Sequence, residues 1–448
     1  MSEPITIPSL LPADRLERHV PDVKPLYGAG EAVAEANRCL YCHDAPCVVA
    51  CPTGIDVPGF IRKIATGNVR GSAHTILSAN LLGYSCARVC PVEVLCVGAC
   101  VYNVWDRYPP IQIGRLQRYA TETVMTQGPA AKLFTPAPPA GKKVACVGGG
   151  PASLATAGYL ALEGVDVTVF EARNLAGGLN TTGVAPYKMH VEGSLMEVEF
   201  IRSLGVKLRE GVTVGRDVAV RDLMRDHDAV FLGVGLGADA GLEIPEEQGP
   251  GVEGATAWIE RMKLEPGYAL PGVSTALVLG GGNTAIDVAR ELTRLGVPEV
   301  KLVYRRTEAQ MPGYRHEMEA ARREGVQLLE RAVPRAFMRD GDGKLLALEL
   351  QDGRVLAADL VVLAIGQARQ RDLLAQFPGV ELDPKGQVIV DPATGRTGNP
   401  KVFAGGDAVS GGQEVVNAAQ EGKRAARAMC AAMGVKVRID SPMKAGHL

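Results

Sequence analysis

The chain has 448 residues, enough for about three domains, and its 46% hydrophobic and 22% charged residues are typical of a soluble globular protein. Its 48 basic and 50 acidic residues give a formal net charge of −2, which excludes nucleic acid and a membrane as main partners held by a strong electrostatic field. The N-terminus has no signal-peptide pattern and no stretch approaches eighteen uninterrupted apolar residues, so we expect a cytoplasmic protein.

The first 135 residues are expected to form a helical domain rich in cysteine. A helical pattern at 31–38 leads into the cysteines, and the residues after it alternate short helical stretches with loops. Eight of the ten cysteines lie between Cys39 and Cys100. The proline-rich stretch at 135–143 then predicts an extended linker, because proline ends helices and favours extended backbone.

The spacing of these cysteines predicts iron–sulfur binding. They fall into two groups, each with one cysteine directly before a proline: Cys39, Cys42, Cys47 and Cys51, then Cys86, Cys90, Cys96 and Cys100. Closely spaced thiolates bind one [4Fe-4S] cluster from one loop, while the cysteine before proline binds the neighbouring cluster. Structural zinc and simple buried thiols are alternatives. A disulfide framework is disfavoured by the missing signal peptide.

A strand–turn–helix–strand pattern after the linker predicts a dinucleotide-binding fold. The apolar runs are 144–147 and 165–171, and a helical run at 154–162 lies between them. The turn Gly148-x-Gly150-x-x-Ser153, with Pro151 and Ala152 inside it, brings backbone close to a pyrophosphate at the start of the helix. Glu171, at the end of the second run, is placed to accept hydrogen bonds from a ribose.

A second unit of the same kind begins 280 − 148 = 132 residues later. Its turn is Gly280-x-Gly282-x-x-Ala285, with Asn283 and Thr284 in the first helical turn. Arg305 and Arg306 end its second strand, where an acidic residue would favour NADH. Guanidinium groups there can pair with a 2′-phosphate, which favours NADPH electrostatically. The alternative is that both arginines are solvated surface charges.

The rest of the chain carries weaker signals. Short strands are predicted at 360–366 and 402–407, and a closing helix at 414–429. The ends, 1–28 and 436–448, are expected to be loosely ordered. The seven histidines are scattered and match no hydrolase or metal-site pattern, so we assign no catalytic side chain.

Three segments resemble the electron-input part of dihydropyrimidine dehydrogenase: EANRCLYCHDAPCVVACPTGID, SANLLGYSCARVCPVEVLCVGACVYN and PPIQIGRLQ. The chain resembles in particular the separate NAD(P)H-oxidising subunit of the bacterial enzyme, a relative of the small subunit of glutamate synthase, over nearly its whole length. The resemblance implies an α/β protein with a helical iron–sulfur domain followed by two Rossmann-like domains, one inserted in the other. The expected limits are 1–135 for the iron–sulfur domain, 136–244 with 369–448 for FAD, and 245–368 for NAD(P).

The resemblance also implies ligands for two [4Fe-4S] clusters. One cluster is assigned Cys39, Cys42, Cys47 and Cys100, and the other Cys51, Cys90, Cys96 and Gln117, which leaves Cys86 as a spare thiol. Glutamate synthase small subunits tend to carry glutamate at the position of Gln117, so glutamine favours the dihydropyrimidine dehydrogenase branch. The further residues implied as contacts of FAD or NAD(P) are Gly178, Leu179, Lys188, Gly366, Gly406 and Asp407.

Together these features predict an oxidoreductase that passes electrons from NADPH or NADH through FAD and two clusters to a partner. The expected partner is an FMN-containing catalytic subunit that reduces uracil or thymine, within a hetero-oligomer. Alternatives are a glutamate synthase small subunit, an NAD(P)H:ferredoxin oxidoreductase with a ferredoxin-like acceptor, and a redox sensor without catalysis. The two intact glycine turns disfavour the sensor.

Overall fold

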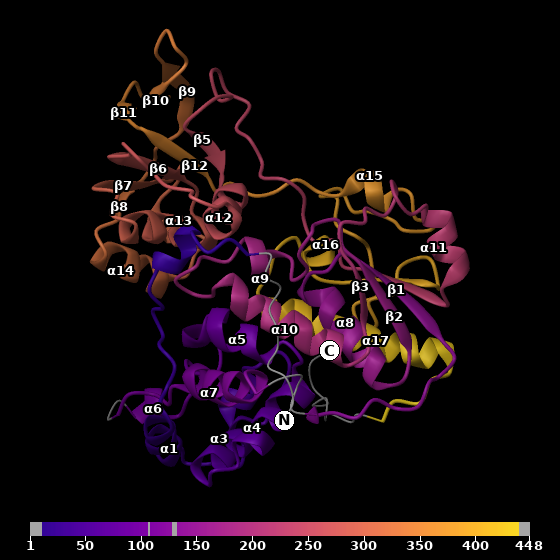
Figure 1. Cartoon of the computed structure of the whole chain (residues 1–448). Coiled ribbons are helices and arrows are strands. Elements are labelled where there is room, and N and C mark those ends of the chain that lie inside the picture. The colour runs from indigo at the N-terminus through magenta and orange to yellow at the C-terminus, as the bar shows by residue number, and fades with distance from the viewer. Residues whose placement is uncertain (1–10, 106–107, 128–131, 439–448) are drawn as a thin grey trace.

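The computed structural model describes residues 11–105, 108–127 and 132–438 (Figure 1). The N-terminal part, indigo to purple in Figure 1, is a group of short helices, and two domains follow that are each built on a five-stranded parallel sheet. One of these domains interrupts the other in the sequence. The predicted fold class is therefore confirmed, while the residue limits of the domains stay a prediction.

The N-terminal helical domain contains only helices in the residues that the structure describes before strand β1. They are η1 (Leu16–His19), α1 (Ala29–Asn37), α2 (Pro46–Val49), α3 (Val57–Ala65), α4 (Val69–Ala79), α5 (Gly83–Val89), η2 (Val92–Val94), α6 (Tyr102–Trp105) and α7 (Ile113–Met125). Side chains fix two helix starts, because Asp56 accepts from the Gly59 amide at 3.0 Å and Asn68 from the Gly71 amide at 2.8 Å. The helix predicted at 31–38 is confirmed as α1.

The first Rossmann domain has its parallel sheet in the order β13-β4-β1-β2-β3. Its strands are β1 (Lys143–Val147), β2 (Asp166–Phe170), β3 (Lys207–Arg209), β4 (Ala229–Leu232) and β13 (Val402–Ala404). Its helices are α8 (Pro151–Leu162), α9 (Leu179–Thr182), α10 (Val191–Ser203), α11 (Val220–Asp226), α15 (Arg371–Leu374), α16 (Asp407–Ser410) and α17 (Val415–Met433). Strand β13 pairs with β4 although the whole second sheet separates them in the sequence, so both chain segments belong to one domain.

The inserted domain has a second parallel sheet in the order β5-β12-β6-β7-β8. Its elements are β5 (Val252–Gly254), α12 (Ala255–Leu264), β6 (Thr275–Leu279), α13 (Asn283–Arg294), β7 (Glu299–Val303), η4 (Glu308–Gln310), α14 (Arg315–Arg323), β8 (Gln327–Leu329) and β12 (Leu360–Leu363). A small antiparallel sheet of β9 (Pro334–Arg339), β10 (Leu345–Leu350) and β11 (Val355–Ala357) lies between β8 and β12 in the chain. This sheet had not been predicted.

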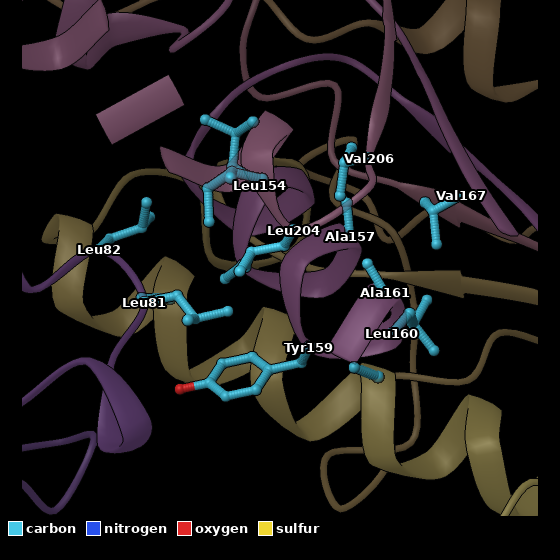
Figure 2. Close-up of a cluster of buried hydrophobic side chains, with 14 of the residues drawn as sticks. Leu81, Leu82, Leu154, Ala157, Tyr159, Leu160, Ala161, Val167, Leu204 and Val206 are labelled. Atoms are coloured by element: carbon cyan, nitrogen blue, oxygen red, sulfur yellow. The ribbon is translucent and has the colours of Figure 1, made fainter. Parts of the chain in front are cut away.

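One hydrophobic core continues from the N-terminal helical domain into the first Rossmann domain. Leu81 and Leu82, between α4 and α5, belong to the same buried cluster as Tyr159 of α8 and Leu204 after α10 (Figure 2). A Cβ on Gly158 would lie 2.7 Å from Leu81 Cδ1, so α8 packs closely against this segment. Because the cores of proteins are close-packed, this part of the helical domain packs tightly against the first Rossmann domain.

The structure of the N-terminal segment differs from the prediction that residues 1–28 are loosely ordered. Arg15 and Glu17 are 1% and 0% exposed, so residues 14–20 are not loosely ordered. Glu17 accepts a hydrogen bond from the Val191 amide at 2.9 Å, and Arg15 pairs with Glu192, so the segment is fixed to the start of α10. Paired buried charges supply the ordering that the sequence pattern does not show. Residues 1–10 and 439–448 lie outside the described residues.

Glu197 of α10 makes a second polar contact between the first Rossmann domain and the helical domain. Its side chain is 2% exposed and accepts from the amides of Tyr84 at 2.9 Å and Ser85 at 3.2 Å, and from the Ser85 hydroxyl. These donors lie in the first turn of α5, the helix that carries Cys86. Burial raises the pKa of Glu197 to about 7, although the hydrogen bonds from Ser85 and Tyr84 favour the ionised form.

We predict that Glu197 makes the folded protein less stable as the pH rises. Its pKa in the folded protein is about 7, above the ordinary 4.5, so its contribution is full below pH 4.5 and falls as the pH passes through 7. Between pH 6 and 8 the loss is about 1 kcal/mol, which Glu197→Gln removes while keeping an oxygen acceptor. Thermal unfolding across this range measures how the free energy of unfolding changes with pH, with Glu319→Gln, at an exposed position of α14, as the control. Equal slopes in all three proteins would contradict the prediction.

Candidate functional site

The first glycine turn has the conformation that a pyrophosphate site needs. Gly148 has φ +88°, and a Cβ there would lie 2.6 Å from the Gly233 carbonyl oxygen, so only glycine fits. Glu171, 8% exposed at the end of β2, accepts from the Gly149 amide at 2.6 Å. The helix α8 starts at Pro151, and its N-cap Gly150 offers no capping side chain. The first amides of this twelve-residue helix are therefore available to an anion.

Two further predicted segments meet the same turn. A Cβ on Gly178 would lie 2.8 Å from Gly150 Cα, which places Gly178 and the following Leu179 against the turn. A Cβ on Gly406 would lie 3.0 Å from Ala152 Cβ, so Asp407 stands beside the first turn of α8. Burial raises the pKa of the Asp407 carboxyl. The structure thus brings together three segments that are far apart in the sequence.

Buried polar atoms at this place fit a bound dinucleotide. Ser153 Oγ and Asn180 Oδ1 are buried and have no hydrogen-bond partner among the described residues. Ser153 lies in the first turn of α8 and Asn180 in α9, directly after Leu179. Buried polar groups are normally hydrogen-bonded, so these two atoms are suited to partners on a ligand. The residues present therefore fit the FAD expected here.

Lys188 forms ion pairs with two acidic side chains of the inserted domain. Its ammonium lies 2.7 Å from Asp287 of α13 and 3.1 Å from Glu317 of α14. The side chain of Lys188 is 16% exposed, so this is a largely buried ion-pair group between the two Rossmann domains. Its role as a flavin contact stays a prediction.

The second glycine turn borders a cavity of about 500 Å³. Predicted residues line it: Gly280, Gly282, Thr284, Arg305, Arg306 and Gly366. Asp239 also lines the cavity, and its carboxylate accepts hydrogen bonds from the Thr256 amide at 3.1 Å and the Thr256 hydroxyl at 2.9 Å. Asp239 and Thr256 were missed because 17 residues separate them and no local pattern joins them. The size and the exposed arginines suit a dinucleotide.

Asn283 has a structural partner in this domain. Its Oδ1 accepts from the Tyr314 amide at 2.9 Å, and the Gly313 amide donates to the Gly281 carbonyl at 2.9 Å. The loop before α14 is therefore fixed to the glycine turn. Tyr314 also donates its hydroxyl to Glu414, at the start of α17, at 2.9 Å. Asn283 thus positions the loop, and its contact with the nucleotide stays a prediction.

The first predicted set of cluster ligands meets around one small cavity. Cys39, Cys42, Cys47 and Cys100 line a cavity of about 30 Å³ together with apolar side chains such as Ile61. The pKa of the Cys47 thiol is raised to about 12, mainly by burial and also by charge repulsion from Cys39, Cys100 and Cys42. Thiols in this position bind as thiolates when positively charged iron compensates their charge. The donor set fits one [4Fe-4S] cluster.

The second predicted set of cluster ligands lies beside Cys86, the thiol that was predicted to be spare. Cys90 is surrounded by Cys86, Cys96 and Cys51, and its pKa is raised well above the usual value by a hydrogen bond with Cys86 and by burial. Asn80 Nδ2 donates to Cys86 Sγ at 3.1 Å. Gln117 lies in α7, is 7% exposed and donates from Nε2 to the Gly83 carbonyl at 2.7 Å, at the start of α5. Both Cys86 and Gln117 therefore lie near α5, and the ligand assignment stays a prediction.

No three His, Cys, Asp or Glu side chains in the described part of the chain surround a single metal-ion position. The thiolates of a four-iron cluster are spread over separate irons, so they do not converge on one point.

Two family models match the chain. Residues 16–129 match "Dihydroprymidine dehydrogenase domain II, 4Fe-4S cluster", and residues 142–422, more than half of the chain, match "Pyridine nucleotide-disulphide oxidoreductase". The chain belongs to the pyridine nucleotide–disulphide oxidoreductase family. With its 4Fe-4S domain, it is an NAD(P)H-dependent FAD and iron–sulfur oxidoreductase.

Curated relatives align with this chain over most of their length. The chain is 34% identical over 414 residues to the NAD-dependent dihydropyrimidine dehydrogenase subunit PreT of Escherichia coli, covering 92% of this chain and 97% of that one. It is 33% identical over 434 residues to the glutamate synthase [NADPH] small chain of the same organism, covering 89% and 91%. This oxidoreductase is therefore of the PreT and glutamate synthase small-chain type, as the resemblance predicted.

Solved structures confirm the fold of the two Rossmann domains. Thioredoxin reductase of T. acidophilum superposes with a TM-score of 0.54 at 22% identity and covers 65% of this chain and 98% of its own. FprA of Mycobacterium tuberculosis in complex with NADPH gives a TM-score of 0.53 at 20% identity and covers 65% and 84%. At this identity the likeness concerns the fold alone. None of the described helices is long and apolar enough to cross a membrane.

We predict that Gln117 and not Cys86 completes the second ligand set. Cys86→Ala should then keep about eight irons per chain, whereas Gln117→Ala should lose one of two clusters. Iron analysis and EPR of anaerobically purified protein measure this, with Cys430→Ala in α17 as a buried-thiol control. Loss of about half the iron in Cys86→Ala with full iron in Gln117→Ala would reverse the assignment.

We also predict that Arg305 and Arg306 bind a 2′-phosphate. Both are exposed at the cavity. Replacing either by alanine should raise the KM for NADPH about 10- to 150-fold, because a hydrogen bond to a charged group contributes about 1.5 to 3 kcal/mol. The KM for NADH should change little, and Arg354→Ala, in the turn between β10 and β11, is the control. Equal losses for both nucleotides would refute this role.

Proposed function

We propose that the chain is the electron-input subunit of an NAD(P)-dependent dihydropyrimidine dehydrogenase. In this proposal it holds FAD and two [4Fe-4S] clusters, and an FMN-containing partner reduces uracil or thymine. The main support is that both cysteine groups lie in a helical domain whose Leu81 and Leu82 share a buried cluster with α8, the helix of the first glycine turn. Similarity to PreT over 92% of the chain also supports it.

The bound groups would supply the redox chemistry: hydride transfer from NAD(P)H to flavin, then transfer of single electrons to the clusters. The residues of the chain position these groups. The loop that Asn283 holds is bonded through Tyr314 to Glu414, at the start of α17 in the first Rossmann domain. The ion pairs of Lys188 with Asp287 and Glu317 cross the same boundary. Together they hold the inserted domain against the first Rossmann domain.

The structure also gives the two cysteine groups different surroundings. Cys90 ends α5, whose first turn is bonded to Glu197 of the first Rossmann domain. The group with Cys39 and Cys42 lies in loops next to exposed Leu40. We therefore propose that the Cys90 group is closer to the flavin and that the Cys39 group faces the partner.

A glutamate synthase small subunit is the second candidate, because the identity to that chain, 33%, is nearly the same. Gln117 favours the first candidate, since the resemblance associates glutamate with the glutamate synthase branch. The third candidate is an NAD(P)H:ferredoxin oxidoreductase, which would pass electrons to a ferredoxin-like acceptor. A cytoplasmic location and a hetero-oligomer are part of the proposal and stay predictions.

The purified chain is expected to reduce an artificial dye with NAD(P)H but not uracil, thymine, or 2-oxoglutarate with glutamine. Uracil and thymine should be reduced only when the FMN-containing partner is added. Dye reduction without any partner-dependent pyrimidine reduction, together with glutamate formation on adding a glutamate synthase large chain, would favour the second candidate. Uracil reduction by the isolated chain would overturn the proposal.

A further inference from the structure

A buried lysine of the first Rossmann domain enters the N-terminal helical domain. Lys423 of α17 is 2% exposed. Its ammonium donates to the carbonyl oxygens of Ala79 at 2.8 Å and Thr53 at 3.3 Å. It also lies 5.9 Å from the ring centroid of Tyr159, within the range of a cation–π contact. Lys423 therefore carries a positive charge from one domain into the other.

The ammonium of Lys423 lies next to the segment that carries Cys51, a predicted cluster ligand. Thr53 follows Cys51 by two residues, and its hydroxyl lies 3.3 Å from Cys51 Sγ. Burial lowers the pKa of Lys423 to about 8, and the Arg427 charge lowers it too, while Cys51 raises it. The ammonium thus stays mostly protonated at neutral pH. In a buried environment its field acts on the thiolates with little screening.

We propose that Lys423 raises the reduction potential of the cluster assigned to Cys51, Cys90 and Cys96. The inference rests on the proposed function, because it assumes that this cluster takes electrons from the flavin. Reduction adds one electron, and hence one negative charge, to the cluster, while Lys423 keeps its proton. A fixed positive charge nearby stabilises the reduced form more than the oxidised form. Lys423 thus acts only through its positive charge and forms no bond in the reaction.

The size of the effect follows from Coulomb's law. Two unit charges roughly 10 Å apart, at an effective dielectric constant of about 20, interact strongly enough to change an equilibrium roughly tenfold. For a one-electron couple a tenfold change corresponds to about 59 mV. Removal of the charge should therefore lower the midpoint potential of this cluster by about that amount.

The decisive variant is Lys423→Gln, which removes the charge and keeps an amide donor for the two carbonyls. Lys423→Arg keeps the charge and should stay within about twofold of the unaltered chain, roughly 18 mV. Lys436→Gln is the matched control, because Lys436 is exposed after α17 and the net charge changes equally. The measurement is an anaerobic EPR titration of the holoprotein with dithionite and mediators. We expect one cluster to shift in Lys423→Gln and neither to shift in the control.

Three results would overturn the proposal. The first is an unchanged potential in Lys423→Gln with full iron content. The second is an equal shift of both clusters, because it would indicate a general change of the protein. The third is loss of iron in both Lys423→Gln and Lys423→Met, which would show a structural role instead. Failure of NAD(P)H to reduce the clusters of the unaltered chain would refute the proposed function alone, since dithionite still measures the potentials.

Discussion

The N-terminal helical domain and the first Rossmann domain share one hydrophobic core, and the rest of the structure depends on this contact. Leu81 and Leu82 pack against α8, the helix that begins at the first glycine turn (Figure 2). Two buried polar side chains also cross the contact, since Glu197 is hydrogen-bonded to α5 and Lys423 to the segment after Cys51. Buried charges are costly unless they are hydrogen-bonded, so this arrangement tolerates little movement. The helical domain is therefore packed closely against the helix that begins at the first glycine turn.

The inserted domain is held by different means. Its contacts with the first Rossmann domain include hydrogen bonds and ion pairs of side chains such as Lys188 and Tyr314. Such polar contacts are more easily rearranged than a shared core. The N-terminal segment also bridges these two domains, because Glu17 bonds to α10 and lies 3.7 Å from Lys263 of α12. The inserted domain is thus held largely by polar side chains, together with a small apolar contact of Leu295 with Ala185 and Tyr187.

The sequence alone predicted the parts of the site that depend on local chemistry. The glycine turns at Gly148 and Gly280 could be predicted because a tight turn needs the conformations that glycine adopts. The cysteine groups could be predicted because the ligands of one cluster are spaced a few residues apart. Glu197 and Lys423 were missed, since their partners lie in another domain and become visible only when the chain is folded. Helical periodicity does place Lys423 on the same face as Ala419 and Ala426, so a charge on a buried face was an available signal.

The central claim is that electrons of NAD(P)H reach the cysteine-bound clusters only through the flavin held at the first glycine turn. Anaerobic rapid mixing of NADPH with the holoprotein and with flavin-depleted protein of equal iron content tests this directly. The clusters should be reduced in the holoprotein, after the flavin, and should stay oxidised in the flavin-depleted protein until FAD is restored. Reduction of the clusters by NADPH at the same rate without flavin would contradict the claim.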